Sequence, residues 1–195
     1  MAPANPELRE LVKEMNRSVL AGGFKKSTDE KLTAEGEIFP SAVVPVTAMN
    51  RIGEERVFPM KWGFSQGGKL LINARVETAA KKPTFREAWE NHRCIICASW
   101  YYEWEHDEKK RPTQKYFLRT DNTGLIRLAG LYRMEDGLPA FVILTRPASR
   151  NLIWMHDRMP LLLPPDAAKE WIRPTSDPEA VAKQCITKLI WQQAG

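Results

Sequence analysis

Apolar residues near the start of the chain recur every three or four positions, which predicts an amphipathic helix. The residues on this apolar face are Leu8, Leu11, Val12, Met15 and Val19. Asn5 is a suitable N-cap and Pro6 suits the first helical position, so we expect the helix to begin there. Gly22 and Gly23 predict its end, and the polar residues 24–37 predict a surface loop.

From Ser41 onward the pattern changes, and short runs rich in β-branched and aromatic residues are separated by turn signals. SAVVPVTAM (41–49) and RVFPMKWGF (56–64) flank residues 50–53, which predicts a β-hairpin. Further strands are predicted in LLINARVE (70–77), CIICASWYYEW (94–104), KYFLR (115–119), LIRLAGLY (125–132) and AFVILTR (140–146).

Short helices interrupt or follow these strands. Thr84 and Glu87 have capping-box spacing at the start of FREAWENH (85–92). PPDAAKEWI (164–172) and DPEAVAKQC (177–185) each open with Pro and Asp, as short helices do. Many strands with few long helices predict an α+β fold with a curled, mostly antiparallel, barrel-like sheet and a few peripheral helices.

The length of 195 residues and a hydrophobic content of 43% fit one domain, residues 1–195, with a sizeable core. No apolar run reaches the roughly 18–20 residues that a membrane span needs, and the start of the chain has no signal-peptide pattern. Three cysteines, an odd number, favour a reducing compartment over a disulfide scaffold. We therefore expect a monomeric cytosolic protein without a membrane segment.

The charge balance favours an anionic partner. Lys and Arg number 29 against 24 Asp and Glu, which gives a net charge of +5 and a pI near 9.2. Nucleic acid is the usual partner of such a chain. A basic protein with no polyanionic ligand is the alternative.

Cys94 and Cys97, with His92 just before them, have a spacing that occurs in metal and redox sites. No second such pair completes a zinc set, and the segment has the pattern of a buried strand. Because side chains alternate along a strand, the two thiols are expected on opposite faces of the sheet. We therefore predict structural cysteines, and neither a metal nor another cofactor.

Glu103 lies among four aromatic residues in the segment WYYEW (100–104). A carboxyl group in an apolar pocket has its charged form disfavoured, which raises its pKa and suits a general acid or base. The alternative is an exposed strand residue whose aromatic neighbours face the core.

Two further polar segments adjoin apolar runs. His156 and Arg158 lie just before PLLLPP, and Asn73 and Arg75 directly follow LLI. Polar groups at such junctions are either paired or functional, and the two arginines are candidate forks for phosphate. Trp62, beside a glycine, offers a face for base stacking. The alternatives are a histidine with a structural role and a core tryptophan.

Together, these segments match one family. WGF, INARVET, FREA, RCIICASWYYEW, LAGLY, VILTR and HDRMPLLLP occur in its order and spacing, from about Ile38 to Trp171. On these motifs the chain resembles the SOS response-associated peptidase (SRAP) family, whose members process abasic sites in single-stranded DNA. The resemblance implies single-stranded DNA with abasic sites as the partner of a cytoplasmic, nucleoid-associated protein.

The resemblance also implies a mechanism. Family members remove the initiator Met to expose a Cys within an MCGR start. The free α-amine of that Cys condenses with the abasic-site aldehyde as a Schiff base, and the thiolate then closes a thiazolidine ring. An α-amine is partly neutral at physiological pH, so it is a competent nucleophile.

By the matching motifs, Asn73 would position the N-terminal residue and the sugar. Glu103 would act as general acid and base for imine formation. His156 would help to open the deoxyribose ring and, in reverse, to release the crosslink.

The same motifs imply contacts to DNA on either side of the lesion. Arg75 and Arg158 would hold flanking phosphates, and Trp62 would stack on a neighbouring base. Pro40, in IFPSAVVPV, matches a loop proline that lies near the DNA in relatives.

The start of this sequence departs from the family. It reads Met-Ala-Pro, no Cys occurs before Cys94, and the strand that carries MCGR in relatives is missing. Three explanations are open: a misassigned or trimmed start, which we favour; a paralogue that lost the nucleophile; or an exposed Ala2 amine that forms only a reversible Schiff base.

Three functional readings follow. The first is an enzyme of abasic-site processing, unable to crosslink in the chain as written. The second is a module that binds single-stranded or damaged DNA without covalent chemistry. The third takes the family name literally, as a peptidase that removes its own first residue. The final residues of the chain match the family poorly, and their role is open.

Overall fold

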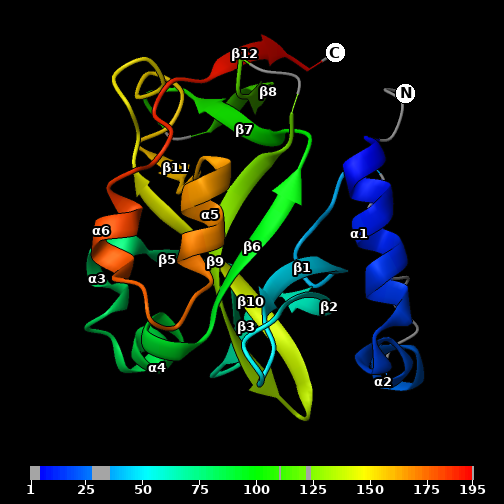
Figure 1. Cartoon of the computed structure of the whole chain (residues 1–195). Coiled ribbons are helices and arrows are strands. Elements are labelled where there is room, and N and C mark those ends of the chain that lie inside the picture. The colour runs from blue at the N-terminus through cyan, green and yellow to red at the C-terminus, as the bar shows by residue number, and fades with distance from the viewer. Residues whose placement is uncertain (1–4, 28–35, 110, 122–123, 195) are drawn as a thin grey trace.

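Five strands close into a small barrel (Figure 1). The computed structural model describes residues 5–27, 36–109, 111–121 and 124–194. Around the barrel the order is β10, β2, β1, β6, β9 and back to β10. The bounds of these strands are β1 Val43–Met49, β2 Glu55–Trp62, β6 Arg93–Ala98, β9 Ile126–Glu135 and β10 Leu138–Pro147.

Four of the five barrel pairings are antiparallel, and β10 closes the barrel against β2 in parallel, through Ala140–Phe141 beside Lys61–Trp62. The predicted hairpin across residues 50–53 is formed, with Met49 opposite Glu55. The predicted α+β fold with a mostly antiparallel, barrel-like sheet is thus confirmed.

Two further short strands pair with β10. β5 (Asn73–Arg75) runs parallel to it, with Asn73 opposite Ile143 and Arg75 opposite Thr145. β11 (Arg158–Pro160) runs antiparallel to it, with Arg158 opposite Pro147. One strand therefore carries both polar segments singled out in the sequence.

A three-stranded sheet lies at one end of the barrel and contains Glu103 (Figure 1). Its order is β12 (Ile190–Gln193), β8 (Pro112–Arg119) and β7 (Tyr101–His106). Only residues 99–100 separate β7 from β6, so CIICASWYYEW forms two strands rather than the single one predicted. A small hairpin pairs β3 (Phe64–Gln66) with β4 (Lys69–Leu71).

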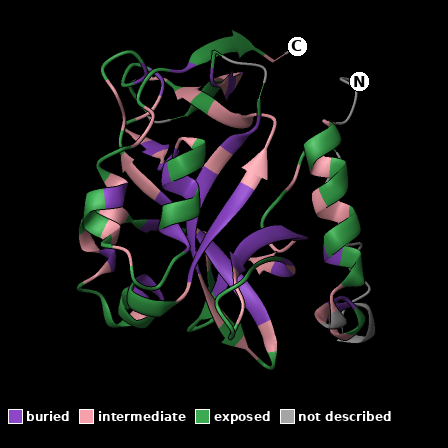
Figure 2. Ribbon diagram, viewed as in Figure 1, coloured by how far each residue is buried: buried purple, intermediate pink, exposed green. Residues whose placement is uncertain are grey.

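Helices cover two opposite sides of the barrel (Figure 1). On one side lie α3 (Val76–Ala79), α4 (Pro83–Asn91), α5 (Pro165–Trp171) and α6 (Pro178–Ala182), and on the other α1 (Pro6–Arg17) and α2 (Val19–Ser27). Buried residues concentrate in the barrel strands (Figure 2). No helix within the described residues is long and apolar enough to cross a membrane.

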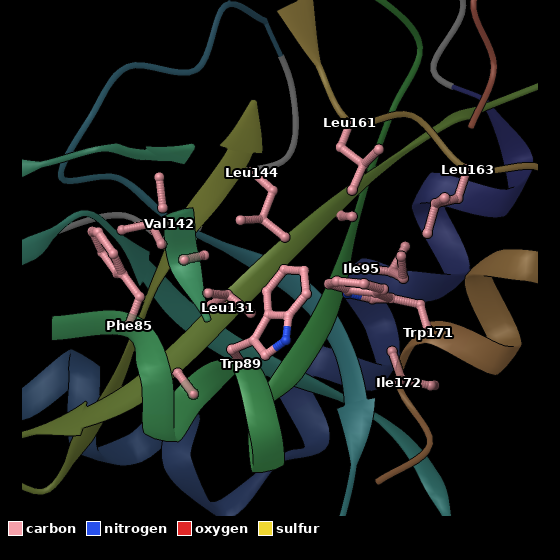
Figure 3. Close-up of a cluster of buried hydrophobic side chains, with 14 of the residues drawn as sticks. Phe85, Trp89, Ile95, Leu131, Val142, Leu144, Leu161, Leu163, Trp171 and Ile172 are labelled. Atoms are coloured by element: carbon pink, nitrogen blue, oxygen red, sulfur yellow. The ribbon is translucent and has the colours of Figure 1, made fainter. Parts of the chain in front are cut away.

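The core beneath α4 and α5 centres on two tryptophans. Trp89 and Trp171 meet edge to face, with ring centroids 5.6 Å apart (Figure 3). Such contacts contribute stability beyond the buried area of the rings. Buried Arg93 ties the same elements together by donating hydrogen bonds to the carbonyl oxygens of Trp89, Trp171 and Arg173 at 2.6–2.8 Å.

The N-terminal helix begins as predicted and ends earlier. The Asn5 side chain accepts a hydrogen bond from the Glu7 N–H at 2.9 Å, which confirms the N-cap. Ser18 takes an extended backbone conformation and breaks the helix, and its hydroxyl accepts a hydrogen bond from the Leu20 N–H. A second helix then runs through Gly22 and Gly23, so the prediction that they end the helix is wrong.

Two other local predictions need correction. α2 extends to Ser27, so the predicted loop 24–37 begins later, and residues 28–35 lie outside the described part. α4 begins at Pro83, with Lys82 as N-cap, because proline already supplies the first helical φ. Thr84 therefore forms no capping box, and its hydroxyl accepts a hydrogen bond from the Gln66 side chain.

The segment LLINARVE also differs from the prediction of one strand. It contributes to β4 and β5 and then turns directly into α3. Ile72 separates the two strands, and its carbonyl accepts a hydrogen bond from the Ile143 N–H at 3.1 Å. This bond brings Asn73 alongside β10.

Candidate functional site

Glu103 is a half-buried carboxyl group on β7. Burial raises its pKa above the ordinary value. The imidazoles of His156 and His106 and a hydrogen bond from the Trp104 N–H, at 3.2 Å, act in the opposite direction. A carboxyl group with opposing influences of this kind is suited to give and take a proton as a general acid and base.

His156 is held by the backbone that follows it. Its Nδ1 accepts a hydrogen bond from the Arg158 N–H at 3.0 Å. Nδ1 also lies 3.2 Å from the Arg158 carbonyl oxygen, so it can accept from the N–H or donate to the carbonyl, depending on the tautomer. The Asp157 carboxylate lies 3.3 Å from Nδ1 and would pair with the protonated ring. In the tautomer with Nδ1 as acceptor, Nε2 carries the proton and can present its N–H to a bound substrate.

His106 completes this cluster, and sequence reasoning missed it. The rings of His106 and His156 lie 5.7 Å apart between centroids, with their planes at 60°. The available signal was the proximity of His106 to Glu103 in a chain with only three histidines. Regular strand alternation would have placed the two residues on opposite faces.

Asn73 and Trp62 lie at adjacent positions. The Trp62 Nε1–H donates a hydrogen bond to the carbonyl of Ile72 at 3.0 Å, and Asn73 is the next residue, exposed on β5. The Trp62 ring is half-buried and stacks over Phe141, with centroids 6.4 Å apart. Trp62 therefore combines the predicted aromatic surface with the role of a packed tryptophan.

Pro40 is exposed beside Trp62. The next residue, Ser41, has a positive φ of 76° and donates its N–H to the Trp62 carbonyl at 2.8 Å. A non-glycine residue with such a φ is uncommon and needs support from its surroundings. This bond fixes the loop that carries Pro40 against the end of β2.

The two candidate phosphate-binding arginines differ in their surroundings. Arg158 forms a two-point ion pair with Glu77, at 2.6 and 2.9 Å, and also donates to the Thr145 carbonyl at 2.7 Å. The Arg158 side chain lowers the pKa of Glu77 through this pairing. Arg75 is exposed and forms no ion pair within the described residues.

The structure therefore arranges the predicted residues in two connected groups. Trp62, Asn73 and Arg75 adjoin β10 directly or through β5. Glu103 and His156 lie with His106 toward the three-stranded sheet. The bond from Arg158 to His156 joins the groups, because Arg158 lies on β11 and pairs with β10.

The cysteines of β6 have the predicted structural character. Cys94 packs into one core cluster and Cys97 against the other, on opposite sides of the strand. Burial raises the pKa of Cys97 to about 12 and that of Cys94 further, so both thiols stay protonated and unreactive. Among the described residues, no group of three His, Cys, Asp or Glu side chains is arranged to hold a metal ion.

Comparison with known proteins adds a family assignment. A family model described as SOS response associated peptidase (SRAP) matches residues 5–193. The chain is 36% identical over 122 residues to the abasic site processing protein YedK of Escherichia coli, covering 59% of this chain and 54% of that protein. It is 33% identical over 169 residues to the abasic site processing protein YoqW of Bacillus subtilis, covering 77% of this chain and 75% of that protein.

A solved structure shares the fold. A phage-related protein from Bordetella bronchiseptica superposes with a TM-score of 0.71 at 24% identity, covering 85% of each chain. The match to YedK spans only about half the length of that relative.

Proposed function

This chain belongs to the SRAP family, and we propose that it recognises and processes abasic sites in single-stranded DNA. The names of the relatives support the substrate. The observation that carries the proposal is the arrangement of Glu103 and His156. A half-buried carboxyl group of raised pKa lies within electrostatic range of the His156 imidazole, whose Nδ1 accepts a hydrogen bond from the Arg158 N–H and leaves Nε2–H as a donor.

These two groups suit the chemistry of an abasic site. In ring opening the C1 hydroxyl gives its proton to the Glu103 carboxylate as the carbonyl forms. The bond between C1 and the ring oxygen breaks, and the ring oxygen takes a proton that the Nε2–H of His156 can supply. An amine then adds to the aldehyde, and the resulting hydroxyl leaves as water with a proton from the Glu103 carboxyl. The exposed amide of Asn73 would orient the sugar and the amine.

The DNA would lie along the surface that carries Trp62 and the two arginines. Arg75 is exposed and has no ion-pair partner within the described residues, so it is placed to meet a phosphate. Trp62 offers one ring face while Phe141 covers the other, and Pro40 flanks it. Arg158 would reach a phosphate only in exchange for Glu77.

The amine comes from the N-terminus in the family mechanism. Glu7, in the first turn of α1, pairs with Arg127 on β9 at 2.9 Å. Arg127 lies opposite Cys97, at the end of β6 that leads into β7 and Glu103. The described start of the chain therefore approaches the end of the barrel where Glu103 lies. Ala2 lies outside the described residues and would supply an amine that forms only a reversible Schiff base.

A single-stranded oligonucleotide with one abasic site tests this proposal. The chain as written is expected to give a covalent band on a denaturing gel only after borohydride reduction of the imine. A version that begins Met-Cys-Gly-Arg is expected to give the band without reduction. In that version Glu103→Gln should slow formation of the band on the order of 10²-fold or more, as loss of a general acid does. No band from any version, with or without reduction, would refute the proposal.

A second candidate is a binding module without covalent chemistry, for which the exposed Arg75 and the half-buried Trp62 would be sufficient contacts. In that case the chain retards abasic DNA on a native gel while no version yields a covalent band. Arg75→Ala should then weaken binding, whereas Glu103→Gln should leave binding unchanged.

A further inference from the structure

The side chain of His106 has no part in the mechanism above, yet it contacts the ring of His156 edge-on. We propose that His106 is a positioning residue of this site: its ring holds His156 in place, and its positive charge favours the carboxylate form of Glu103. The inference rests on the proposed function, because it assigns His106 a part in the same proton transfers.

The geometry of β7 brings His106 into the cluster. It lies three positions after Glu103, which in a regular strand would place the two side chains on opposite faces. The pairing with β8 is irregular at this point: Trp104 lies opposite Lys115, whereas His106 lies opposite Pro112. The irregularity interrupts the alternation where His106 meets the ring of His156.

Burial and the charged groups around Glu103 shift its pKa in both directions. Burial raises the pKa of Glu103 most, and Asp157 raises it further. His156 lowers it most among the side chains, and His106 lowers it as well. A nearby imidazolium stabilises a carboxylate, which is the direction in which His106 acts on Glu103. Removing the His106 ring is therefore expected to raise the pKa of Glu103.

Three other ionisable groups on β7 or just after it have a hydrogen-bond or ion-pair partner or remain neutral. Glu105 accepts a hydrogen bond from the Tyr116 hydroxyl at 3.2 Å. Asp107 pairs with Arg111 at 2.7 Å, and its hydrogen bonds from Arg111 lower its pKa, with a small contribution from His106. Burial raises the pKa of the Tyr101 hydroxyl, which stays neutral.

His106 differs from His156 in its access to water. It is exposed, whereas the side chain of His156 is 36% exposed and is fixed by its bond to the Arg158 N–H. A proton released at the half-buried Glu103 therefore has a solvent-facing imidazole close by. This arrangement suits a reaction in which a carboxyl group must alternate between its two forms in one cycle.

The test begins with the free protein, so it does not depend on any DNA activity. The ¹³C shift of the Glu103 carboxyl is followed against pH in the wild type, His106→Gln, His106→Lys and the control His92→Gln. His106→Gln should raise the pKa of Glu103 by about 0.3–1 unit, as loss of a nearby partly solvated cation does. His106→Lys retains a cation and should restore the wild-type value, and His92→Gln should not change it. An unchanged titration in His106→Gln would overturn the inference.

The second arm measures imine trapping on abasic DNA across pH, with the same variants. His106→Gln should move the acidic limb of the profile to higher pH by the shift seen at Glu103. A Glu103 shift without any change in this limb would also overturn the assigned role. If no protein traps the DNA at any pH while the Glu103 shift is present, the proposed function fails and the coupling of His106 to Glu103 stands.

Discussion

Arg158 and Glu77 face each other across strand β10 and form a two-point ion pair, with N···O distances of 2.6 and 2.9 Å. Arg158 comes from β11 and Glu77 from the first turn of α3, so the pair ties together two segments that flank β10 on opposite edges. The Glu77 carboxylate binds the Arg158 guanidinium group, which the resemblance assigns to a DNA phosphate. Glu77 therefore competes with the DNA for that fork.

Glu77→Gln is expected to tighten binding of single-stranded DNA. The substitution removes a negative charge next to the phosphate path and frees Arg158, with a gain of up to about fivefold for a partly exposed pair. The slope of log affinity against log salt should steepen by up to about 1. Fluorescence anisotropy at several salt concentrations measures both quantities. Weaker binding would show instead that Glu77 orients Arg158 for phosphate.

Glu103→Gln is expected to stabilise the fold at neutral pH while it removes activity. Because burial raises the pKa of Glu103, the folded protein holds this proton more tightly than the unfolded chain. That contribution is complete below the unfolded pKa and is lost as the pH rises through the folded value. Gln mimics the protonated form, so it should raise Tm at pH 7.5, by about 2–4 °C for each kcal/mol.

The two proteins should approach equal Tm below about pH 3, under the ordinary carboxyl pKa, where Glu103 is protonated in both states. Thermal unfolding at the two pH values makes the comparison. A lower Tm for Glu103→Gln at pH 7.5 would contradict the assigned effect of burial.

Arg93→Met is expected to destabilise the protein severely. The change leaves the buried carbonyl oxygens of Trp89, Trp171 and Arg173 without their donor, at a cost of about 3–5 kcal/mol. Urea unfolding measures the loss. Exposed Arg86→Met, on the neighbouring helix α4, is the control and should change stability by less than about 0.5 kcal/mol. Equal effects of the two changes would show that the carbonyl contacts contribute little.

Two glycine substitutions are expected to have opposite signs. A Cβ at Gly130 would lie 2.7 Å from Ile96 and 2.9 Å from the Val142 carbonyl oxygen, so Gly130→Ala should cost about 1–3 kcal/mol. At Gly22, exposed within α2, a Cβ meets nothing within 4 Å. Gly22→Ala should therefore stabilise by about 0.5–1 kcal/mol. Urea unfolding distinguishes them, and a stabilising Gly130→Ala would show that the barrel interior can expand.

Local sequence patterns predicted most strands and helices, and they failed where the backbone changes direction within an apolar run. Only two residues separate the end of β6 at Ala98 from the start of β7 at Tyr101, and the two strands belong to different sheets. The signal for the break after Arg17 was the lone Ser18, which a helical pattern tolerates. These boundaries depend on tertiary packing, which a local pattern does not contain.

The candidate site was predictable residue by residue, and its connections were not. Asn73, Glu103 and His156 stood out as polar groups beside apolar runs. The pairing of Arg158 with Glu77, and the contact of His106 with His156, join residues that are distant in sequence. Strand register determines both, so local patterns did not predict that Arg158 is engaged by Glu77 or that the His106 ring lies against His156.

Strand β10 pairs with four others, and through β5 and β11 it carries Asn73 and Arg158. Opening this strand would open the barrel and release both segments at once, because within the described residues neither β5 nor β11 pairs with another strand. Loss of DNA binding during denaturation should therefore coincide with global unfolding. Amide protons of β10 should exchange at the slowest rate in the protein. Partial unfolding that leaves the barrel intact should therefore leave the segments of Asn73 and Arg158 in place.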